Sequence, residues 1–343
     1  MTEEIRIGSI PMKQTITENS LKGGIIMDFY QRALALKEET IAHRRYLHQN
    51  AEVGLHMPKA IAYITEKLTE YGLEPRPCGH GVTALLGKGE STFLLRSDMD
   101  ALPMPEESGE PFACPTGEHA HTCGHDFHAA MLLTAAKMLK EYEPNLKGQI
   151  KLMFQPAEET FEGSDDMIAH GILEDPPVDA AMACHVAPGT MPIGLFMYNS
   201  GGVMMNSVDG FRITIRGKGG HGAYPNRTVD PIHTAVQIYT ALEGLIAREA
   251  DPEKTCVLTV GKFRAGNAAN IIPDTAEIEG TLRTNDRRER EHLVKRISET
   301  ARDIASLWGA EAEITPLSAV PPLVCDGEPV SYTHLTLPTI VPV

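Results

Sequence analysis

The densest group of chemically reactive side chains lies in residues 119–128. This segment, with Glu118 before it, holds four histidines, one cysteine and two carboxylates. Cys123 and His125 stand two residues apart across Gly124, a spacing that lets a turn aim sulfur and imidazole at one ion. Cysteine, histidine and carboxylate together favour a borderline transition ion such as zinc, manganese or cobalt over calcium. Taken alone, the segment is also compatible with a solvated histidine-rich loop.

Polar side chains also follow three short apolar runs, as expected of buried strands that deliver residues at their carboxyl ends. The runs are residues 93–95 before Asp98 and Asp100, residues 150–154 before Glu158 and Glu159, and residues 180–184 before His185. In open α/β sheets, ligands gather in the crevice outside these strand ends. The pattern therefore predicts that the three groups lie near one another.

Each group can be interpreted as part of a catalytic site or as an ordinary structural feature. Asp98 and Asp100 can orient a metal-ligating imidazole or bind the metal, or they are solvated turn acids. Adjacent side chains in an extended turn point apart, so one of Glu158 and Glu159 can hold a metal while the other takes a proton from water. The plain alternative for this pair is a surface loop. His185 is either a ligand or a satisfied core histidine.

Apolar spacing predicts the elements that position these groups. It indicates helices over residues 28–50, 58–71 and 126–142, the last with Asp126 as its N-cap. Helices that alternate with the three buried strands predict an α/β fold, with a mixed, mainly parallel sheet flanked by helices.

The pattern changes after residue 206. The expected order is strand, helix, two strands, helix and strand, over residues 209–216, 229–248, 256–263, 275–283, 286–308 and 311–315. This βαββαβ order predicts a ferredoxin-like α+β domain of its own. We expect a catalytic domain formed by residues 27–206 and 316–330, into which a lid or dimerisation domain of residues 207–315 is inserted.

Neither end of the sequence fits this domain organisation. Residues 1–26 lack periodicity and Met27 opens an amphipathic helix, so we expect residues 1–26 to be a non-native extension. Residues 331–343 resemble translated adapter sequence, so we expect an artefactual tail and an authentic chain that stops near residue 330.

Composition narrows the classes of function. The chain has 343 residues, is 42% hydrophobic and carries a net charge of −15, so no basic face indicates nucleic acid or an anionic membrane. No apolar run has the ~20 residues that a membrane helix needs. The six cysteines have no framework spacing, which indicates reduced thiols and a cytoplasmic protein.

One glycine-rich stretch is similar to a nucleotide-binding motif. Residues 217–222 match the glycine spacing of a dinucleotide fingerprint, but the next helix does not follow directly and no acidic residue closes a second parallel strand. We interpret the glycines as a tight turn that presents His221. Asn270 and Arg283 are further polar candidates in this half, with a turn asparagine and a solvated strand-end arginine as alternatives.

From about Met27 to about residue 327 the sequence resembles the metal-dependent aminoacylase and carboxypeptidase superfamily, in its hippurate-hydrolase and auxin-conjugate-hydrolase branch. The matching segments are Arg-Ser-Asp98-Met-Asp100-Ala-Leu-Pro, His121-Thr-Cys123-Gly-His125-Asp-Phe-His128, Gln-Pro-Ala-Glu158-Glu159, Cys184-His185, Gly-Lys-Gly-Gly-His221-Gly-Ala-Tyr-Pro, Asn270-Ile-Ile-Pro and Glu-Gly-Thr-Leu-Arg283. Thr122 departs from this pattern, because the family usually has alanine there.

The resemblance implies two divalent metal ions (Zn, Mn or Co), with Cys123 bridging them and His125, Glu159 and His185 as further ligands. It implies Glu158 as general base. His119 is not expected to be a ligand, and His121 and His128 are expected in supporting or loop positions. The family's last metal-ligating histidine follows a Gly-Ser-Glu-Asp-Phe-like segment that this sequence lacks, and His334 lies in the suspected tail.

The implied reaction is hydrolysis of an N-acyl amino acid to a carboxylic acid and the free amino acid. His221, from the small domain of a partner subunit in a homodimer, would stabilise the oxyanion, while Asn270 and Arg283 would hold the substrate carboxylate. The alternatives are a dipeptidase or N-acetyl-diaminopimelate deacetylase of the same superfamily, or an inactive metal-binding fragment.

Overall fold

The computed structural model describes residues 27–187, 194–199 and 201–325. The expectations for residues 1–26, for residues 326–343 and for His334 lie outside the described residues. The chain forms two compact units, the first extending to Tyr198 and the second beginning at Asn199. None of the helices in the described part is both long and apolar enough to cross a membrane.

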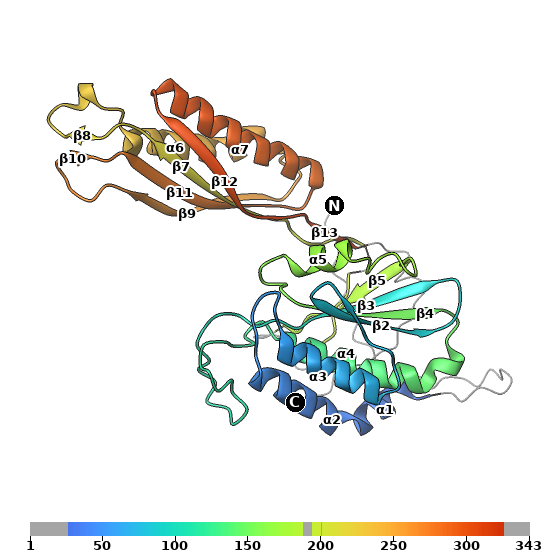
Figure 1. Cartoon of the computed structure of the whole chain (residues 1–343). Coiled ribbons are helices and arrows are strands. Elements are labelled where there is room, and N and C mark those ends of the chain that lie inside the picture. Colours follow the sequence, from blue (N-terminus) through green and yellow to red (C-terminus); the bar gives the residue numbers. More distant parts are fainter. Residues whose placement is uncertain (1–26, 188–193, 200, 326–343) are drawn as a thin grey trace. The chain divides into compact units, whose positions relative to one another are not determined.

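The first unit is a five-stranded mixed sheet with helices on both faces (Figure 1). Its helices are α1 Phe29–Ala35, α2 Lys37–Gln49, α3 Pro58–Glu70, α4 His125–Tyr142 and α5 Gly163–Ala169. Its strands are β1 Arg76–Cys78, β2 Gly81–Gly87, β3 Thr92–Asp98, β4 Gln149–Gln155 and β5 Ala180–Ala183, in the order β1-β2-β4-β3-β5. Strand β3 runs parallel to β4 and β5, whereas β2 runs antiparallel to β1 and β4.

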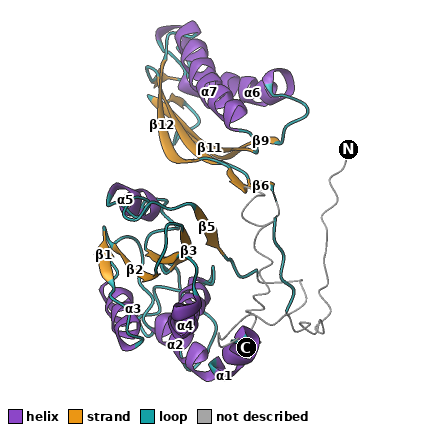
Figure 2. Cartoon of the chain, turned by 90° about the vertical axis from the view of Figure 1, so that its right-hand side faces the viewer, coloured by secondary structure: helices purple, strands orange, loops and turns teal. Residues whose placement is uncertain are grey.

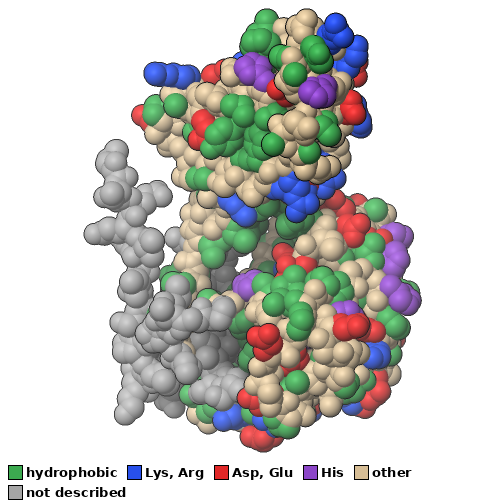
Figure 3. Space-filling model, turned by 90° about the vertical axis from the view of Figure 1, so that its left-hand side faces the viewer, with side chains coloured by type: hydrophobic (Ala, Val, Ile, Leu, Met, Phe, Trp, Pro, Cys, Tyr) green, Lys and Arg blue, Asp and Glu red, His purple; other side chains and the backbone are tan. Residues whose placement is uncertain are grey.

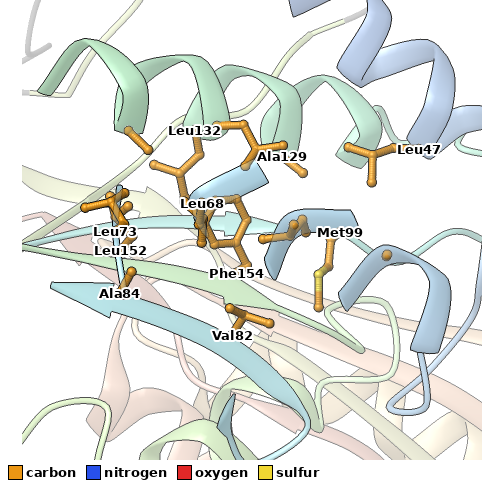
Figure 4. Packing of buried hydrophobic residues seen from close by; sticks show 14 of the residues in the cluster. Leu47, Leu68, Leu73, Val82, Ala84, Met99, Ala129, Leu132, Leu152 and Phe154 are labelled. Atoms are coloured by element: carbon orange, nitrogen blue, oxygen red, sulfur yellow. The ribbon is translucent and has the colours of Figure 1, made fainter. Parts of the chain in front are cut away.

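The core of this unit lies between the sheet and helices α2, α3 and α4. Strands β2 and β4 and the three helices contribute the apolar side chains that meet there (Figure 4). Those labelled in the figure include Leu47, Leu68, Val82, Ala84, Ala129, Leu132, Leu152 and Phe154. Helix α5 covers the opposite face (Figure 2). Because both faces carry helices, the parallel strands can be largely apolar, which is why they contain short apolar runs in the sequence.

The second unit is a four-stranded antiparallel sheet in the order β12-β7-β11-β9, with helices α6 and α7 on one face (Figures 1 and 2). Its main elements are β7 Val208–Arg216, α6 Pro231–Glu249, β9 Cys256–Ala265, β11 Thr275–Thr284, α7 Arg287–Leu307 and β12 Glu311–Val320. Two short ladders join β8 Gly220–His221 to β10 Ile271–Ile272 and β6 Gly202–Met205 to β13 Leu323–Cys325. The mixed sheet with helices and the βαββαβ unit confirm the predicted fold class.

Three local predictions were wrong. Residues 28–50 form two helices, because the backbone of buried Leu36 (φ −95°, ψ 5°) departs from helical geometry between them. Strand β12 runs to Val320 instead of ending at 315, since Pro316 lies at a register shift on an edge strand, where its missing N–H is tolerated. Helix α4 is capped by Gly124 in the left-handed conformation (φ 88°), and Asp126 lies inside its first turn.

Candidate metal centre

The carboxyl ends of β3, β4 and β5 bring the predicted residues of the first unit together. Asp98 ends β3, Glu158 and Glu159 follow β4, and His185 follows β5. Helix α4 starts at His125 with its amino end directed to the same edge of the sheet, so Cys123 also reaches the group. The parallel pairing of β3 with β4 and β5 is the physical reason for this convergence.

His125 is the side chain shared by all three possible ligand groups in the described residues. Its ring is completely buried, and Nδ1 lies 3.2 Å from Oδ1 of Asp100, to which it donates. Nε2 has no hydrogen-bond partner among the described residues and lies 3.9 Å from a carboxylate oxygen of both Glu158 and Glu159. Burial opposes the charged ring, but Asp100 and Asp98 raise the pKa of His125 above its ordinary value.

Cys123 and His185 form the second close pair of donors. The Sγ atom of Cys123 lies 3.4 Å from Nε2 of His185, whose Nδ1 donates to the carbonyl of Val186 over 2.6 Å. This hydrogen bond fixes the proton on Nδ1 and leaves the Nε2 lone pair directed toward the sulfur. Burial and the neighbouring carboxylates, Glu159 first, raise the pKa of the Cys123 thiol to about 12.

Asp98 is held by two basic side chains and is almost fully buried. His128 donates from Nδ1 to Oδ1 of Asp98, and Arg96 donates to Oδ2 over 2.7 Å. Burial favours the protonated acid, but these two partners bring the pKa of Asp98 well below its ordinary value. Nε2 of His128 accepts the backbone N–H of Val186 over 2.9 Å, so both of its ring nitrogens are engaged.

The loop that carries the two glutamates is closed and strained. Ala157 (φ 49°) and Phe161 (φ 62°) both occupy the left-handed region, which is costly for residues with a Cβ atom. The carbonyl of Ala157 accepts the N–H groups of Glu162 and Gly163, both over 3.2 Å. A Cβ atom on Gly163 would stand 1.6 Å from the carbonyl oxygen of Pro156, so only glycine fits there.

This loop orients the glutamates differently. The backbone N–H of Glu159 donates to Oδ2 of Asp100 over 3.1 Å, and Oε1 of Glu159 is buried without a hydrogen-bond partner among the described residues. The side chain of Glu158 is 34% exposed, more than that of Glu159. Burial and the charge of Asp98 raise the pKa of Glu158 above its ordinary value.

The donor atoms fit divalent metal ions. Two atoms that share a zinc ion at about 2.0–2.3 Å lie about 3–4 Å apart, which matches both the 3.4 Å and the 3.9 Å separations. The partnerless atoms Nε2 of His125 and Oε1 of Glu159 are buried, and buried polar atoms normally have partners. Burial and the neighbouring carboxylates raise the pKa of the Cys123 thiol, and a cation bound at this site would stabilise its thiolate form. The carboxylate of Asp100, which orients the His125 ring through Nδ1, completes the pattern of a metal-ligating histidine.

The other predicted side chains belong to the second unit. His221 lies in β8, Asn270 comes directly before β10, and the N–H of Gly222 donates to the Asn270 carbonyl over 2.8 Å. The N–H of Ala223 donates to Nδ1 of His221, which places the ring proton on Nε2. Arg283 lies on β11 and is exposed, between buried neighbours.

The glycine-rich stretch forms tight backbone contacts. A Cβ atom on Gly217 would stand 2.2 Å from the carbonyl oxygen of Val229, and one on Gly219 would stand 2.6 Å from that of Ile272. The predicted tight turn is not formed here: Lys218 is bridged to Val229, and Gly220 and His221 form the strand β8 that pairs with β10.

Sequence reasoning missed several supporting side chains. Arg96 had no assigned role, although its position two residues before Asp98 on the same strand face was a usable signal. The predicted N-cap Asp126 instead accepts from His48 over 2.8 Å and from Arg44 over 2.9 Å. No local pattern announced this pairing, because the partners come from helix α2.

His119 and His121, which were not expected to bind metal directly, belong to none of the possible ligand groups in the described residues. Nδ1 of His119 lies 3.2 Å from the carbonyl oxygen of Ala51. His121 is buried, and burial lowers its pKa to about 4. Both histidines therefore stay outside the proposed ligand set.

Comparisons with known proteins agree with this geometry. Residues 94–336 match the family described as peptidase family M20/M25/M40. The chain is 39% identical to the N-acetyl-L-cysteine deacetylase of Bacillus subtilis (strain 168) over 86% of this chain and 71% of the relative. It is 35% identical to the hippurate hydrolase of Campylobacter jejuni over 89% of this chain and 80% of the relative.

Solved structures show the same fold. A protein from methicillin-resistant Staphylococcus aureus superposes with a TM-score of 0.82 at 31% identity, covering 88% of this chain and 81% of that one. A dinuclear metal-binding peptidase of Bacillus subtilis superposes with a TM-score of 0.70 at 31% identity, covering 86% and 77%. The chain belongs to peptidase family M20/M25/M40 and is a metal-dependent hydrolase of amide bonds.

Proposed function

We propose that the protein hydrolyses the amide bond of N-acyl amino acids, releasing a carboxylic acid and the free amino acid. The observation that carries this proposal is the position of Glu158, an accessible carboxylate with a raised pKa beside the partnerless Nε2 of His125. The names of the relatives agree, among them an N-acyl-L-amino acid amidohydrolase of Geobacillus stearothermophilus that is 37% identical.

Two divalent ions, zinc, manganese or cobalt, are the proposed cofactors, held by Cys123, His125, Glu159 and His185. Cys123, His125 and His185 form one possible ligand group. Glu159 belongs to a second group with His125 and Glu158. When bound, such ions polarise the amide carbonyl and lower the pKa of a water molecule toward ~7. Asp100 acts by holding His125 and the Glu159 backbone, and Asp98 acts by holding His128 at the edge of the site.

Glu158 is the proposed general base. A carboxylate whose pKa is raised takes a proton from water more readily than an ordinary one, and it can return that proton to the leaving amine. The strained backbone at Ala157 holds Glu158 at its place in the loop, which supports a role that depends on position.

We propose that the second unit, which begins at Asn199, is the lid or dimerisation domain and supplies the groups that bind the rest of the substrate. His221, from the small domain of a partner subunit, donates its Nε2 proton to the developing oxyanion. Asn270 and Arg283 hold the substrate carboxylate, the arginine through two parallel hydrogen bonds. The first unit, which extends to Tyr198, is the proposed catalytic domain.

A homodimer through the small domain is part of this proposal. Helix α6 exposes Ile232, Val236 and Tyr239, which are 37%, 44% and 40% exposed and recur at helical spacing on one side. Figure 3 shows hydrophobic side chains grouped on one face of this unit. Apolar stripes of this kind favour association. Because the chain is acidic, we assign the protein neither a nucleic-acid nor a membrane partner. Its scattered cysteines are typical of reduced thiols, so we propose a cytoplasmic location.

Product identification tests the proposed function. The zinc-, manganese- or cobalt-loaded protein is incubated with hippurate, N-acetyl amino acids, N-acetyl-diaminopimelate and dipeptides, and the products are separated by chromatography. We expect free amino acid from hippurate or the N-acetyl amino acids. Faster release from dipeptides would favour a peptidase, the reading suggested by a 34% identical thermostable carboxypeptidase of Saccharolobus solfataricus. Release only from N-acetyl-diaminopimelate would indicate that deacetylase. No turnover with metal bound would indicate an inactive metal-binding protein.

A further inference from the structure

His185 is the most exposed of the four proposed metal ligands. It lies two residues after the end of β5, which is an edge strand of the first sheet. An exposed ring beyond a strand end can adopt several rotamers, and holding one of them costs entropy. A metal ligand has to be close to its productive position before the ion binds, so other residues must fix His185.

The residue after His185 is tied to helix α4. Nδ1 of His185 donates to the carbonyl of its neighbour Val186 over 2.6 Å, and the N–H of Val186 donates to Nε2 of His128 over 2.9 Å. The Val186 side chain lies against Gly124, where a Cβ atom would stand 2.4 Å from Cγ2 of Val186. Val186 is therefore held by its backbone and by its side chain, and the His185 ring is held through it.

His128 has a single tautomer in this arrangement. Because Nε2 accepts the N–H of Val186, the ring proton is on Nδ1, which donates to Oδ1 of Asp98. The His128 side chain is almost completely buried, and its ring meets the His185 ring edge-on, with centroids 4.5 Å apart. Asp98, His125 and His128 form one of the possible ligand groups. The two occupied nitrogens favour a supporting role for His128 over a role as a ligand.

Arg96 fixes the carboxylate that faces His128. It donates from Nη1 to Oδ2 of Asp98 over 2.7 Å and from Nε to Oε1 of Gln155 over 2.9 Å. Asp98 is the last residue of β3 and pairs with Gln155, the last residue of β4. A continuous chain of hydrogen bonds therefore leads from the end of β4 to the ring of His185.

We propose that His128 is a positioning residue, which holds the metal ligand His185 through the Val186 backbone, and that Asp98 sets the tautomer of His128. This inference rests on the proposed function in one respect, the assignment of His185 as a ligand. In this role His128 touches neither the ion nor the substrate. Supporting hydrogen bonds of this kind contribute a factor of about 10–100 to metal affinity, because they restrict the ligand before the ion binds.

Zinc affinity tests the proposal without turnover. Dissociation constants are measured by competition with a chromophoric chelator, for the unmodified protein, His128→Leu, His185→Ala and the double variant. His128→Leu removes the acceptor of the Val186 N–H and should weaken zinc binding by about 10–100-fold. In the His185→Ala background it should cause no further loss, because no ligand is left to position. An equal loss in both backgrounds would show that His128 itself binds the ion, and would overturn the proposal.

Two further variants separate positioning from general stability. His128→Gln keeps an acceptor oxygen near the place of Nε2 and should regain most of the affinity that His128→Leu loses. His43→Leu is the matched control, because His43 is also a buried histidine with a hydrogen bond at each ring nitrogen. It should lower the thermal midpoint and leave the zinc affinity unchanged. Equal losses of affinity in His43→Leu and His128→Leu would contradict the positioning role.

Asp98→Asn tests the tautomer and covers the event that His128→Leu does not fold. Asparagine presents an NH₂ group either to Nδ1 of His128 or to Arg96, so one link of the chain is lost in both orientations. Zinc affinity should fall about tenfold with His185 present and stay unchanged in the His185→Ala background. Nitrogen NMR of histidine-labelled protein should show His128 protonated on Nδ1 in the unmodified protein. Protonation on Nε2 would exclude the proposed chain.

The ligand assignment and the positioning role can fail separately. If His185→Ala binds zinc as tightly as the unmodified protein, His185 is not a ligand and both are wrong. If His185→Ala binds zinc weakly while His128→Leu and Asp98→Asn bind it as tightly as the unmodified protein, the ligand assignment stands and the positioning role is wrong.

Discussion

The Nε2 atom of His125 faces the Oε1 atom of Glu159 across 3.9 Å, and neither atom has a hydrogen-bond partner among the described residues. Two buried ligand atoms at this distance are too far apart to form a hydrogen bond with each other. Their separation matches that of two ligands of one metal ion.

Metal removal should therefore lower the stability of the protein. Stripping the ions with a chelator and adding zinc back to about 100 times its dissociation constant should raise the thermal midpoint by roughly 5–10 °C. Elemental analysis and calorimetric melting measure this. Glu159→Ala should lower both the metal content and the gain in midpoint, whereas Glu162→Gln, an exposed acid in the same loop, should change neither. An equal gain in both variants would exclude Glu159 as a ligand.

Replacing the proposed base should separate turnover from metal binding. Glu158→Gln keeps the shape of the side chain but cannot take a proton, so we expect a fall in kcat of about 10²–10⁴-fold. Metal content and thermal midpoint should stay close to those of the unmodified protein. Steady-state rates and elemental analysis on the same preparation provide the comparison, and a retained kcat would refute the assignment.

Two glycines should respond to alanine in opposite directions. A Cβ atom at Gly163 would meet the Pro156 carbonyl at 1.6 Å, so Gly163→Ala should destabilise the protein by about 1–3 kcal/mol and displace the glutamate loop, lowering activity. At Gly244, inside α6, a Cβ atom meets nothing within 4 Å, so Gly244→Ala should stabilise by about 0.5–1 kcal/mol. Urea unfolding followed by circular dichroism measures both changes. A neutral Gly163→Ala would mean that the loop adapts.

A buried histidine outside the possible ligand groups, His43, has a defined neutral form. Tyr71 donates its hydroxyl to Glu39 over 2.9 Å, so it accepts the proton of Nε2 of His43 over 2.7 Å. Nδ1 of His43 then accepts the hydroxyl of Tyr63 over 2.8 Å. This chain of hydrogen bonds suits the uncharged ring and leaves no acceptor for a second ring proton except a tyrosine oxygen.

The stability contributed by His43 should depend on pH. Burial lowers its pKa below the ordinary value, against the charge of Glu39, while Lys67 and Lys137 act with burial. The unfolded ring titrates near 6.5, so below about pH 7 the unfolded chain binds more protons than the folded one. The contribution is therefore complete above pH 7 and is lost as the pH falls toward 5.

Urea unfolding at several pH values tests this prediction. Between pH 7 and pH 5 the free energy of unfolding should fall more steeply for the unmodified protein than for His43→Gln. His56→Gln, a change at an exposed histidine, should keep the original slope. Parallel curves for the unmodified protein and His43→Gln would show that His43 titrates alike in both states.

Some features of the protein could be predicted from the sequence alone. The three apolar runs and the acids and histidine after them indicated the strands and the side chains at their ends, because burial on both faces of a parallel strand leaves a local mark in the sequence. The order of strands and helices likewise gave the ferredoxin-like unit, since each element has its own periodicity.

The tertiary structure decided what each donor atom faces. His125 and His128 look alike in the sequence, yet Asp98 and the Val186 backbone occupy both nitrogens of His128, while His125 keeps a free Nε2. Likewise, α4 is capped by Gly124 and not by Asp126 as predicted, because the hydrogen-bond partners of Asp126 come from another helix. Hydrogen bonds between residues that are 30 to 78 positions apart depend on the packing of the elements, which no local pattern encodes.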